Sequence, residues 1–529
     1  MNGFFSSAAR LTLFVLRRER VTTFIWIAVL LLFACMSMAL EAQTPDELQN
    51  LLLARQNPIR VALQGPIYGV EDFQAGHLFA SQLQLFKLVA AAIMNIFLVM
   101  RHTRGDEEKG RYEVIRSLPV GRLAMPHAAM IVALCVNGLL AISQGLLLWA
   151  LGVGGIDMMG AFTYGAMLGA TGLFFAALAA FFAQLSHSAR DATSYAFLFL
   201  VGSYLVRAVG DQASETLSLI SPFGLVMRAE VFVQNRWWPI FTLLVLALII
   251  CILAYTLNAR RDMEQGLLPQ RRGKAYASPF LCSPAGLAWC LNRNTLISWA
   301  VGMFAFGAAL GGLLGEAEVF GESDAFRMMM PQSPDFSATE LFTMLINVIL
   351  IIICIAPALI LLFKHLGEEK EQRTEQILSG AVSRRNYLAG YVTISFIASV
   401  VMPLLTTLGL WLVGSFMMEI PITFGRMFLA IMVYVPALWV VIGLGVLIIG
   451  LLPKAAILCW AYFAYLFVVG FFGDLLNVPQ WATRLSPIGF IPRLPLDEVH
   501  VITLLILTAV AACLTTSGFI FYRRRDIMA

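Results

Sequence analysis

The chain contains twelve apolar stretches of about twenty residues each, the length that crosses a bilayer as one helix, and this feature restricts the fold most. The composition agrees, because 59% of the residues are hydrophobic and only 13% are charged, whereas soluble domains carry about 25% charged residues. We therefore expect an all-α polytopic membrane protein. The stretches lie near 24–40, 83–100, 125–152, 160–185, 193–210, 239–257, 295–315, 341–363, 389–415, 426–451, 456–473 and 501–521.

Basic residues indicate how these spans are oriented. Twelve spans place both termini and every second connecting segment on the same side of the membrane. These segments hold 26 of the 36 Lys and Arg residues. Because Lys and Arg concentrate in cytoplasmic loops, both termini are predicted to be cytoplasmic. The net charge of +4 reflects this orientation and does not indicate a nucleic-acid partner.

The charged segment 101–122 recurs once. Shifting the sequence by 262 positions gives eight identities in eighteen positions, which indicates an internal duplication. Each half has six spans, so both halves keep the same orientation, and we expect two six-helix units related by a pseudo-twofold axis along the membrane normal. The identical residues are Gly105, Glu107, Arg111, Glu113, Ile115, Ser117, Val120 and Arg122, with Gly367, Glu369, Arg373, Glu375, Ile377, Ser379, Val382 and Arg384.

The duplication predicts the domain organisation. Arginines mixed with Phe and Leu near the N-terminus are typical of a helix that lies at a membrane surface. The predicted parts are a cytoplasmic interfacial helix 1–23, a first transmembrane unit 24–257 with loop 101–122, a cytoplasmic linker 258–293, a second transmembrane unit 294–521 with loop 364–385, and a cytoplasmic tail 522–529.

Two shorter motifs repeat at nearly the same offset. Arg260-Arg261-Asp262 near the end of the first half matches Arg524-Arg525-Asp526 in the second. A Ser-Pro-x-Gly motif occurs in the outer segment before the last span of each half, where we expect a short re-entrant helix and turn. The predicted outer re-entrant caps contain Ser221, Pro222 and Gly224, and Ser486, Pro487 and Gly489.

Small and polar residues inside the spans predict packing rather than chemistry. Gly165 and Gly169 resemble a small-xxx-small face, on which helix backbones approach closely. Isolated amides at Asn95, Asn137 and Gln144 are expected to hydrogen-bond between helices, with substrate binding as the alternative. Lys87 lies near the outer end of its span and is expected to snorkel towards the headgroups, with an ion site as the alternative.

The charge of the repeated loops has two interpretations. On a helix, Glu107 would pair with Arg111, and Glu369 with Arg373, at a spacing of four residues. Such pairs contribute only about 0.2–0.5 kcal/mol, which does not explain so dense a charge. A docking surface for another protein explains it better than a loop that only sets topology, because acidic residues contribute little to topology.

Sequence motifs for an energy source or an active site are absent. The chain has no Gly-x-x-x-x-Gly-Lys-Ser/Thr loop for nucleotide phosphates, no HExxH zinc helix and no GxSxG elbow. Cys282 and Cys290 are spaced too widely for a CxxC metal site. The spans are nearly free of carboxylates, which an ion-coupled carrier needs. We expect no enzymatic activity, no metal and no cofactor on this chain, and a separate motor.

Loop 101–122 carries a family resemblance. Arg101-His-Thr-Arg104, Glu107, Gly110-Arg111, Glu113, Ser117 and Pro119-Val-Gly-Arg122 resemble the loop between the second and third spans of type-2 ATP-binding-cassette (ABC) export permeases. The chain is most similar to the double-length branch that exports polyketide and polyether ionophore antibiotics such as tetronasin. The resemblance implies a bacterial plasma (inner) membrane permease that confers antibiotic resistance, with ATP and Mg bound by two copies of a separate ATPase.

In that family the loop forms a coupling helix that enters a groove on the ATPase. The resemblance implies this role for Arg101, His102, Thr103, Arg104, Glu107, Glu108, Gly110, Arg111, Glu113 and Arg122, and for Gly367, Glu369, Arg373, Glu375 and Arg384 of the second loop.

The second loop departs from the pattern at Lys364-His365-Leu366 and at Ala381, so we expect a weaker contact there. His102 and His365 are expected to snorkel or cap at the membrane edge rather than to sense pH. ATP-driven closure is expected to rock the two halves about a central cavity. A lipid or peptide exporter and an ion-coupled secondary transporter remain alternatives.

Overall fold

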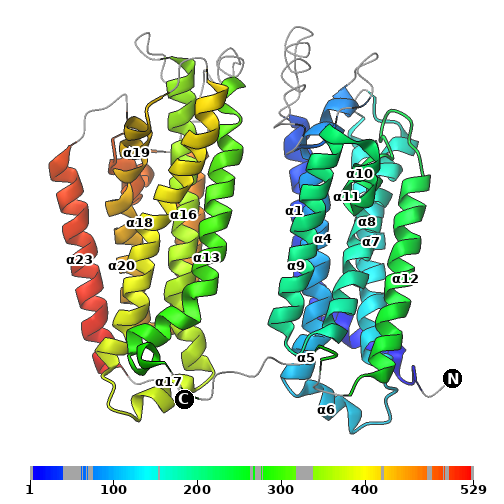
Figure 1. Cartoon of the computed structure of the whole chain (residues 1–529), viewed down its shortest axis with the longest axis horizontal. Helices are drawn as coiled ribbons and strands as arrows, with labels where there is room; N and C mark the ends of the chain where they lie inside the picture. Colours follow the sequence, from blue (N-terminus) through cyan, green and yellow to red (C-terminus); the bar gives the residue numbers. More distant parts are fainter. Residues whose placement is uncertain are drawn as a thin grey trace. The chain divides into compact units, whose positions relative to one another are not determined.

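The computed structural model divides into two compact units, Met1–Arg272 and Gly273–Ala529 (Figure 1). All regular structure in its described residues is helical, without strands. Most of the predicted outer segment 41–82 and the end of the tail lie outside the described residues. These are 4–39, 61, 64–66, 68, 75–152, 155–262, 266–268, 276, 278–316, 337–418, 422–472, 479–492, 494 and 500–525.

The first unit is built around one buried helix. Helix α8 is rich in Gly and Ala, and most of its residues are buried against α4, α7 and α12. The helices of this unit are α1 (Ala8–Ala39), α4 (Ala75–His102), α5 (Arg104–Glu108), α6 (Arg111–Arg116), α7 (Ala124–Leu151), α8 (Met158–Leu185), α9 (Ala189–Ala213), α10 (Glu215–Ile220), α11 (Pro222–Met227) and α12 (Trp238–Arg260).

The second unit packs its helices mainly in pairs. α13 lies along α18, and α20 lies along α23. Its elements are η1 (Pro279–Cys282), α13 (Pro284–Gly311), η2 (Leu314–Glu316), α16 (Ala338–Lys370), α17 (Arg373–Leu378), α18 (Arg384–Met417), α19 (Phe424–Met432), α20 (Val435–Leu451), η3 (Pro453–Ala456), α21 (Ile457–Phe472), α22 (Gln480–Leu485), η4 (Pro487–Phe490) and α23 (Val501–Arg524).

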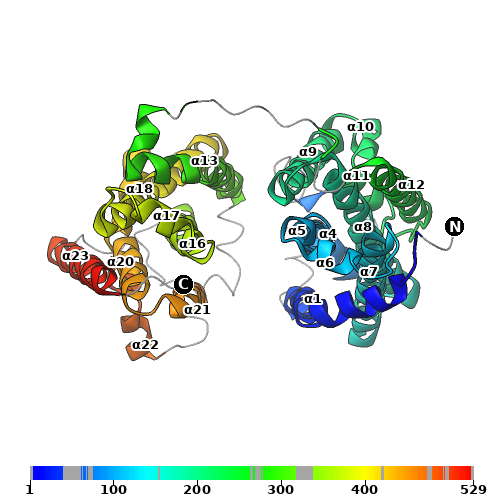
Figure 2. The same ribbon diagram turned by 90° about the horizontal axis from the view of Figure 1, so that it is seen from below.

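Eleven helices in the described part of the chain are long and apolar enough to cross a membrane. They match the last eleven of the twelve predicted spans, and the first predicted span lies in α1. The prediction of an all-α polytopic membrane protein is therefore confirmed. Figure 2 shows the N-terminal part of α1, in dark blue, running across the lower end of the first unit before the helix turns along the bundle.

The small residues of α8 allow close contact with α7, as predicted. A Cβ atom on Gly165 would lie 2.1 Å from the Ala141 carbonyl oxygen, and one on Gly169 would lie 3.0 Å from the Asn137 carbonyl oxygen. These distances leave no room for a side chain at Gly165. The backbones of α7 and α8 therefore pack at a separation that only glycine permits there.

The amide prediction holds for two of the three residues. Asn95 of α4 and Asn137 of α7 exchange hydrogen bonds through their side chains, with Nδ2 to Oδ1 distances of 3.0 and 2.7 Å. Gln144 is buried, and its side-chain amide has no hydrogen-bond partner among the described residues. The Asn95–Asn137 pair satisfies both amides inside the bundle and fixes the register of α4 against α7.

The expectation that Lys87 snorkels is wrong. Its side chain is fully buried, and Nζ lies 4.4 Å from the centroid of the Phe79 ring and 5.2 Å from that of Tyr164. Aromatic faces attract an ammonium group, and this attraction strengthens when water is excluded. Lys87 is therefore held in the core by aromatic rings rather than extended towards headgroups.

Each Ser-Pro-x-Gly motif joins two short helical segments. The Ser221 hydroxyl accepts a hydrogen bond from the Phe223 N–H and donates one to the Ser203 carbonyl at 2.6 Å. A Cβ atom on Gly224 would lie 2.1 Å from the Ser218 carbonyl oxygen. The motif thus makes a tight corner between α10 and α11. In the second unit the equivalent Ser486, Pro487 and Gly489 join α22 to η4.

We predict that Gly165→Leu destabilises the first unit. The new side chain would collide with the α7 backbone, and overpacking of a core costs about 1–3 kcal/mol or more. The matched control is Gly138→Leu in α7, where no atom beyond the adjacent residues and the local helix backbone lies within 4 Å of the added Cβ. Thermal unfolding in detergent measures both. Equal midpoints for the two variants would contradict the close-packed α7–α8 contact.

Candidate functional site

The first repeated loop forms two short helices at the lower end of its unit (Figure 1). Helix α4 ends at His102, α5 follows, and α6 begins after Gly110. Gly110 has a φ of +67°, a left-handed conformation that favours glycine. This residue turns the chain sharply, so that α6 projects beyond the end of the bundle.

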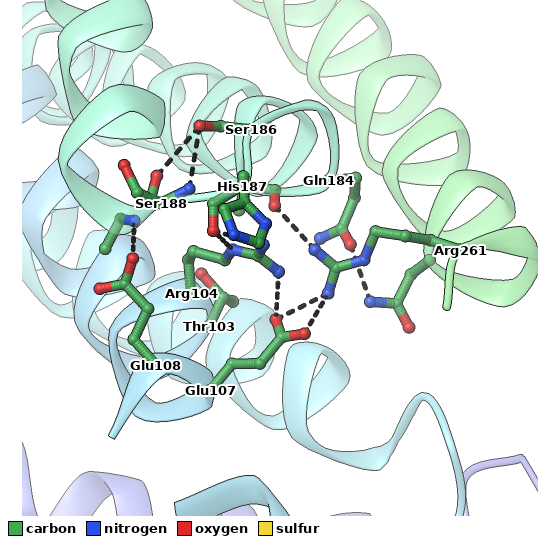
Figure 3. A network of polar contacts seen from close by, with 12 residues as sticks. Thr103, Arg104, Glu107, Glu108, Gln184, Ser186, His187, Ser188 and Arg261 are labelled. Carbon is green, nitrogen blue, oxygen red and sulfur yellow. Dashed lines mark hydrogen bonds and ion pairs between the residues drawn. The ribbon is translucent and has the colours of Figure 1, made fainter. Parts of the chain in front are cut away.

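A buried ion-pair network holds the base of this loop. Glu107 receives two hydrogen bonds from Nη2 of Arg261, at 2.9 and 2.6 Å, and pairs with Nη1 of Arg104 at 2.9 Å. Arg104 also donates through Nε to the His187 carbonyl at 2.9 Å. Figure 3 shows Glu107 between the two guanidinium groups. The network connects α5 to the residue that follows α12 and to the turn between α8 and α9.

Neighbouring contacts extend this attachment. Glu108 accepts a hydrogen bond from the Ala189 N–H, the first residue of α9, at 2.6 Å (Figure 3). Arg122, at the far end of the loop, donates to the Arg261 carbonyl. Arg261 therefore contacts the loop at both ends, through its guanidinium and through its backbone. We call the contacts of Glu107, Arg261 and Arg122 the first brace.

Helix α1 is attached to the same loop by a second set of charges. Arg18 donates to both oxygens of Asp106, at 3.0 and 2.7 Å. Glu19 accepts hydrogen bonds from Arg101 at 2.9 and 3.0 Å and lies 2.8 Å from Nε2 of His102. Burial raises the pKa of the Glu19 carboxyl, but the His102 and Arg101 contacts outweigh burial and hold this pKa below its ordinary value.

Two expectations for the first loop are corrected by these contacts. Glu107 does not pair with Arg111, because Arg111 donates to Asp106 at 2.7 Å instead. His102 neither snorkels nor caps at a surface, since its side chain is fully buried between Glu19 and Asp106. Spacing along one helix could not reveal this arrangement. His102 contacts Glu19 of α1, and Glu107 contacts Arg261, which follows α12.

The second unit contains an equivalent brace. Glu369 receives hydrogen bonds from Nη2 of Arg525 at 2.5 and 2.6 Å, and one from the Tyr522 hydroxyl at 3.1 Å. Arg384 donates to the Arg525 carbonyl at 2.8 Å. We call the contacts of Glu369, Arg525 and Arg384 the second brace. Its three members correspond to Glu107, Arg261 and Arg122 at offsets close to 262.

The second loop also corrects two expectations. Glu369 does not pair with Arg373, which lies 3.4 Å from Glu368 instead. His365 is fully buried, with Nε2 at 2.9 Å from the Tyr522 hydroxyl, so it too neither snorkels nor caps at a surface. At the turn before α17, Gln372 has a φ of +56°, where the first loop has Gly110. The second turn therefore has the same backbone shape without a glycine.

The predicted coupling residues fall into three groups by exposure. His102, Thr103, Arg104, Glu107 and Glu369 are buried. Arg122 and Arg384 are half-buried, as is Gly110 at the turn. The exposed group consists of Arg101, Glu108, Arg111, Glu113, Gly367, Arg373 and Glu375.

An apolar surface accompanies the exposed charges of the first loop. Val114 is 71% exposed and Leu118 is 60% exposed, and Glu113, which directly precedes Val114, is exposed as well. We call Glu113, Val114 and Leu118 the α6 tip. At the positions that correspond to Val114 and Leu118, the second loop has Gln376 and Gly380. Only the first loop therefore presents this pair of exposed apolar side chains.

The brace partners Arg261 and Arg525 were missed as site residues. The sequence carried a signal for them, because Arg260-Arg261-Asp262 recurs as Arg524-Arg525-Asp526 at almost the same offset as the loops. Motifs that repeat together are candidates for mutual contact. Within the described ranges, no group of three or more His, Cys, Asp or Glu side chains is arranged to hold a metal ion.

Comparison with known proteins places the chain in a family. A family model described as "Multidrug efflux system permease Rv1217c, C-terminal domain" matches residues 12–257 and 281–523. The chain is also 33% identical over 540 residues to the multidrug efflux system permease protein Rv1217c of Mycobacterium tuberculosis (strain ATCC 25618 / H37Rv), covering 99% of this chain and 96% of that protein. The chain belongs to this family of multidrug efflux permeases.

Family membership confirms the predicted transport role at the level of an efflux permease. The matched segments span the two loops and most of both units of the permease. Together with the eleven apolar helices, they identify a multi-pass membrane protein. The two braces therefore belong to a multi-pass efflux permease.

We predict that Arg261→Ala destabilises the permease far more than Arg260→Ala. Arg261 is buried and paired with Glu107, whereas Arg260 is exposed. The substitution leaves Arg104 as the guanidinium partner of Glu107 and removes the hydrogen bonds from Arg261, and a hydrogen bond to a charged group contributes about 1.5–3 kcal/mol. Thermal unfolding in detergent and hydrogen exchange of residues 104–116 provide the measurements. If the two variants unfold alike, Glu107 and Arg261 do not form a stabilising buried pair.

Proposed function

We propose that this chain is the transmembrane subunit of an ATP-driven ABC exporter that extrudes hydrophobic or amphipathic antibiotics of the polyketide or polyether ionophore type and so confers resistance. ATP and Mg bind to two copies of a separate ATPase subunit. The observation that carries the proposal is the α6 tip, an exposed apolar and charged surface on a loop whose base is fixed by buried ion pairs. The description of the relative as part of a multidrug efflux system supports a broad, apolar substrate class.

The composition of the α6 tip is that of a protein-binding surface rather than of a surface that only faces water. A loop that only sets topology needs charge, but it has no use for exposed Val114 and Leu118. Protein interfaces combine an apolar centre with a polar rim, and Val114 with Leu118 beside Glu113 has this composition. The ATPase contact therefore centres on the two apolar side chains, while the charges of Glu113 and Arg111 set its orientation.

The first brace gives the tip a mechanical connection to the spans. Movement of α6 acts on α5, and α5 is joined through Glu107 to Arg261 at the end of α12. It also acts on α1 through Asp106 and Arg18. A force applied by an ATPase at the tip thus reaches the first and last helices of the unit together. The second brace performs the same task with a more polar tip, so its ATPase contact is weaker.

The orientation follows from the same arrangement. An ATPase that uses cellular ATP must meet the loops in the cytoplasm, and the positive-inside distribution of Lys and Arg supports that side. Both termini then lie in the cytoplasm, and the bilayer is the inner membrane of a bacterium. The caps formed at Ser221 and Ser486 lie on the outer side, where the substrate leaves.

The docking surface is tested by Val114→Asp. A carboxylate placed at the apolar centre of an interface loses its hydration without gaining a partner, so we expect co-purified ATPase to fall about tenfold or more while membrane abundance is unchanged. Gln376→Asp, at the corresponding position of the second loop, is the matched variant and is expected to have a smaller effect. Drug resistance should fall in parallel with ATPase binding.

Charge reversal at Glu107 is unsuitable for this test. Glu107 lies in the first brace, so its replacement by Arg would break a buried network whether or not an ATPase docks. Glu113→Arg changes only an exposed charge and tests the electrostatic part of the contact. If Val114→Asp and Glu113→Arg both retain the ATPase and full resistance, the α6 tip is not the docking surface.

A further inference from the structure

The second unit contains a cavity that is separate from the repeated loop and its brace. Its volume is about 660 Å³, and it is bounded by α16 and α19, with Leu494 and with Leu504 of α23. Binding sites for small molecules occupy about 300–1,000 Å³. The cavity lies towards the start of α16, at the opposite end of that helix from α17. It is therefore well separated from the second brace.

A row of hydrogen-bonding groups on α16 faces this otherwise apolar space. Glu340, Thr343 and Asn347 all line the cavity, and spacings of three and four residues place them on one face of the helix. Thr343 donates its hydroxyl proton to the Thr339 carbonyl at 2.7 Å, so its oxygen offers lone pairs to a ligand. The row runs about two turns along the helix.

Asn347 is the deepest of these groups. Its side chain is 3% exposed, and its Oδ1 has no hydrogen-bond partner among the residues that the structure describes. Buried side-chain oxygens are normally hydrogen-bonded, because an unsatisfied one costs about 1–3 kcal/mol. An amide that lines a cavity and lacks a partner indicates a ligand with a hydrogen-bond donor.

The opposite wall contains a kinked helix. α19 ends at Met432 and α20 begins at Val435, the two residues between them keep helical backbone angles, and Met432 and Val433 both line the cavity. Pro436 causes the kink, since it has no N–H to donate to the Met432 carbonyl four residues earlier. Membrane helices tolerate such kinks where neighbouring groups satisfy the freed backbone, and this one lies at the cavity wall.

Among the described residues that line the cavity, the charged ones, Glu340 and Arg426, lie towards one side. Arg426 lies 3.8 Å from Glu340 and has a 78% exposed side chain, whereas that of Glu340 is 25% exposed. The second carboxylate oxygen of Glu340 accepts from the Ser337 N–H at the start of α16. The exposure of these two side chains indicates an opening near them, with the apolar space and Asn347 lying deeper.

We propose that this cavity binds an amphipathic molecule with an apolar body and an N–H or O–H donor, which bonds to Oδ1 of Asn347. The site belongs to the second unit alone, because the offset of 262 places Leu85, a buried apolar residue, at the position of Asn347. That the ligand is the exported molecule rests on the function proposed above. Binding itself does not require the ATPase.

Two related dyes test the donor requirement on the purified full-length chain in lipid nanodiscs. Rhodamine 6G has two N–H groups, and tetramethylrhodamine ethyl ester has the same charge and ring system without them. We expect rhodamine 6G to bind more tightly, and Asn347→Leu to weaken it about tenfold, the effect of one lost hydrogen bond. The same substitution should leave binding of the ester unchanged.

Two further variants test whether the effect is specific to Asn347 and whether the dyes bind in this cavity. Asn292→Leu on α13 also removes a buried amide whose Oδ1 has no partner among the described residues, but it lies outside the cavity lining, so rhodamine 6G binding should be unchanged. Ala430→Trp fills the cavity from α19 and should abolish binding of both dyes. Unfolding midpoints in nanodiscs verify that each variant is folded.

The outcomes separate this proposal from the function proposed above. If the wild-type chain does not bind rhodamine 6G, or if folded Asn347→Leu and Ala430→Trp bind it as the wild type does, the cavity is not the site. That result leaves ATPase docking at the α6 tip standing. Conversely, dye binding that depends on Asn347 in a chain that recruits no ATPase would support the site and contradict the ATP-driven mechanism.

Discussion

The structure depends on a buried carboxylate that is shared between guanidinium groups at the end of a membrane bundle. Removing ions from water costs several kcal/mol per ion, so Glu107 is stable there only because Arg104 and Arg261 both reach it. Glu369 is satisfied by the guanidinium of Arg525 together with the Tyr522 hydroxyl. Each pair joins a loop that projects from the bundle to the residue after the last span of its unit. The loop therefore cannot move independently of that span.

The two braces also give the proposed duplication a physical meaning. Glu107, Arg122 and Arg261 recur as Glu369, Arg384 and Arg525, and the contacts among them recur as well. Between the braces the halves have diverged. Val114 and Leu118 are replaced by Gln376 and Gly380, and buried Leu85 corresponds to Asn347. We infer that the first unit specialises in ATPase contact and the second in ligand contact, on a common framework.

The sequence predicted the helices well because the bilayer permits few alternatives to an apolar helix of about twenty residues. It also predicted the tight packing at Gly165 and interhelical hydrogen bonds at Asn95 and Asn137, although not that the two residues bond to each other. It failed where a partner comes from a distant segment. Spacing along one helix favoured Glu107 with Arg111, but Arg261, 154 residues further along the chain, was the better partner because it is buried beside Glu107. Lys87 was misplaced for a similar reason, since the rings of Phe79 and Tyr164 that surround it cannot be located from spacing alone.

In the proposed function, the first brace transmits movement from the α6 tip to the spans, while the tip makes the stronger of the two ATPase contacts. The most direct test is the number of substrate molecules exported per ATP hydrolysed by the reconstituted complex carrying Glu107→Gln, which keeps the side-chain shape but removes its charge. We expect the ATPase still to bind and to hydrolyse ATP while export per ATP falls severalfold. Export per ATP equal to that of the wild type would contradict it.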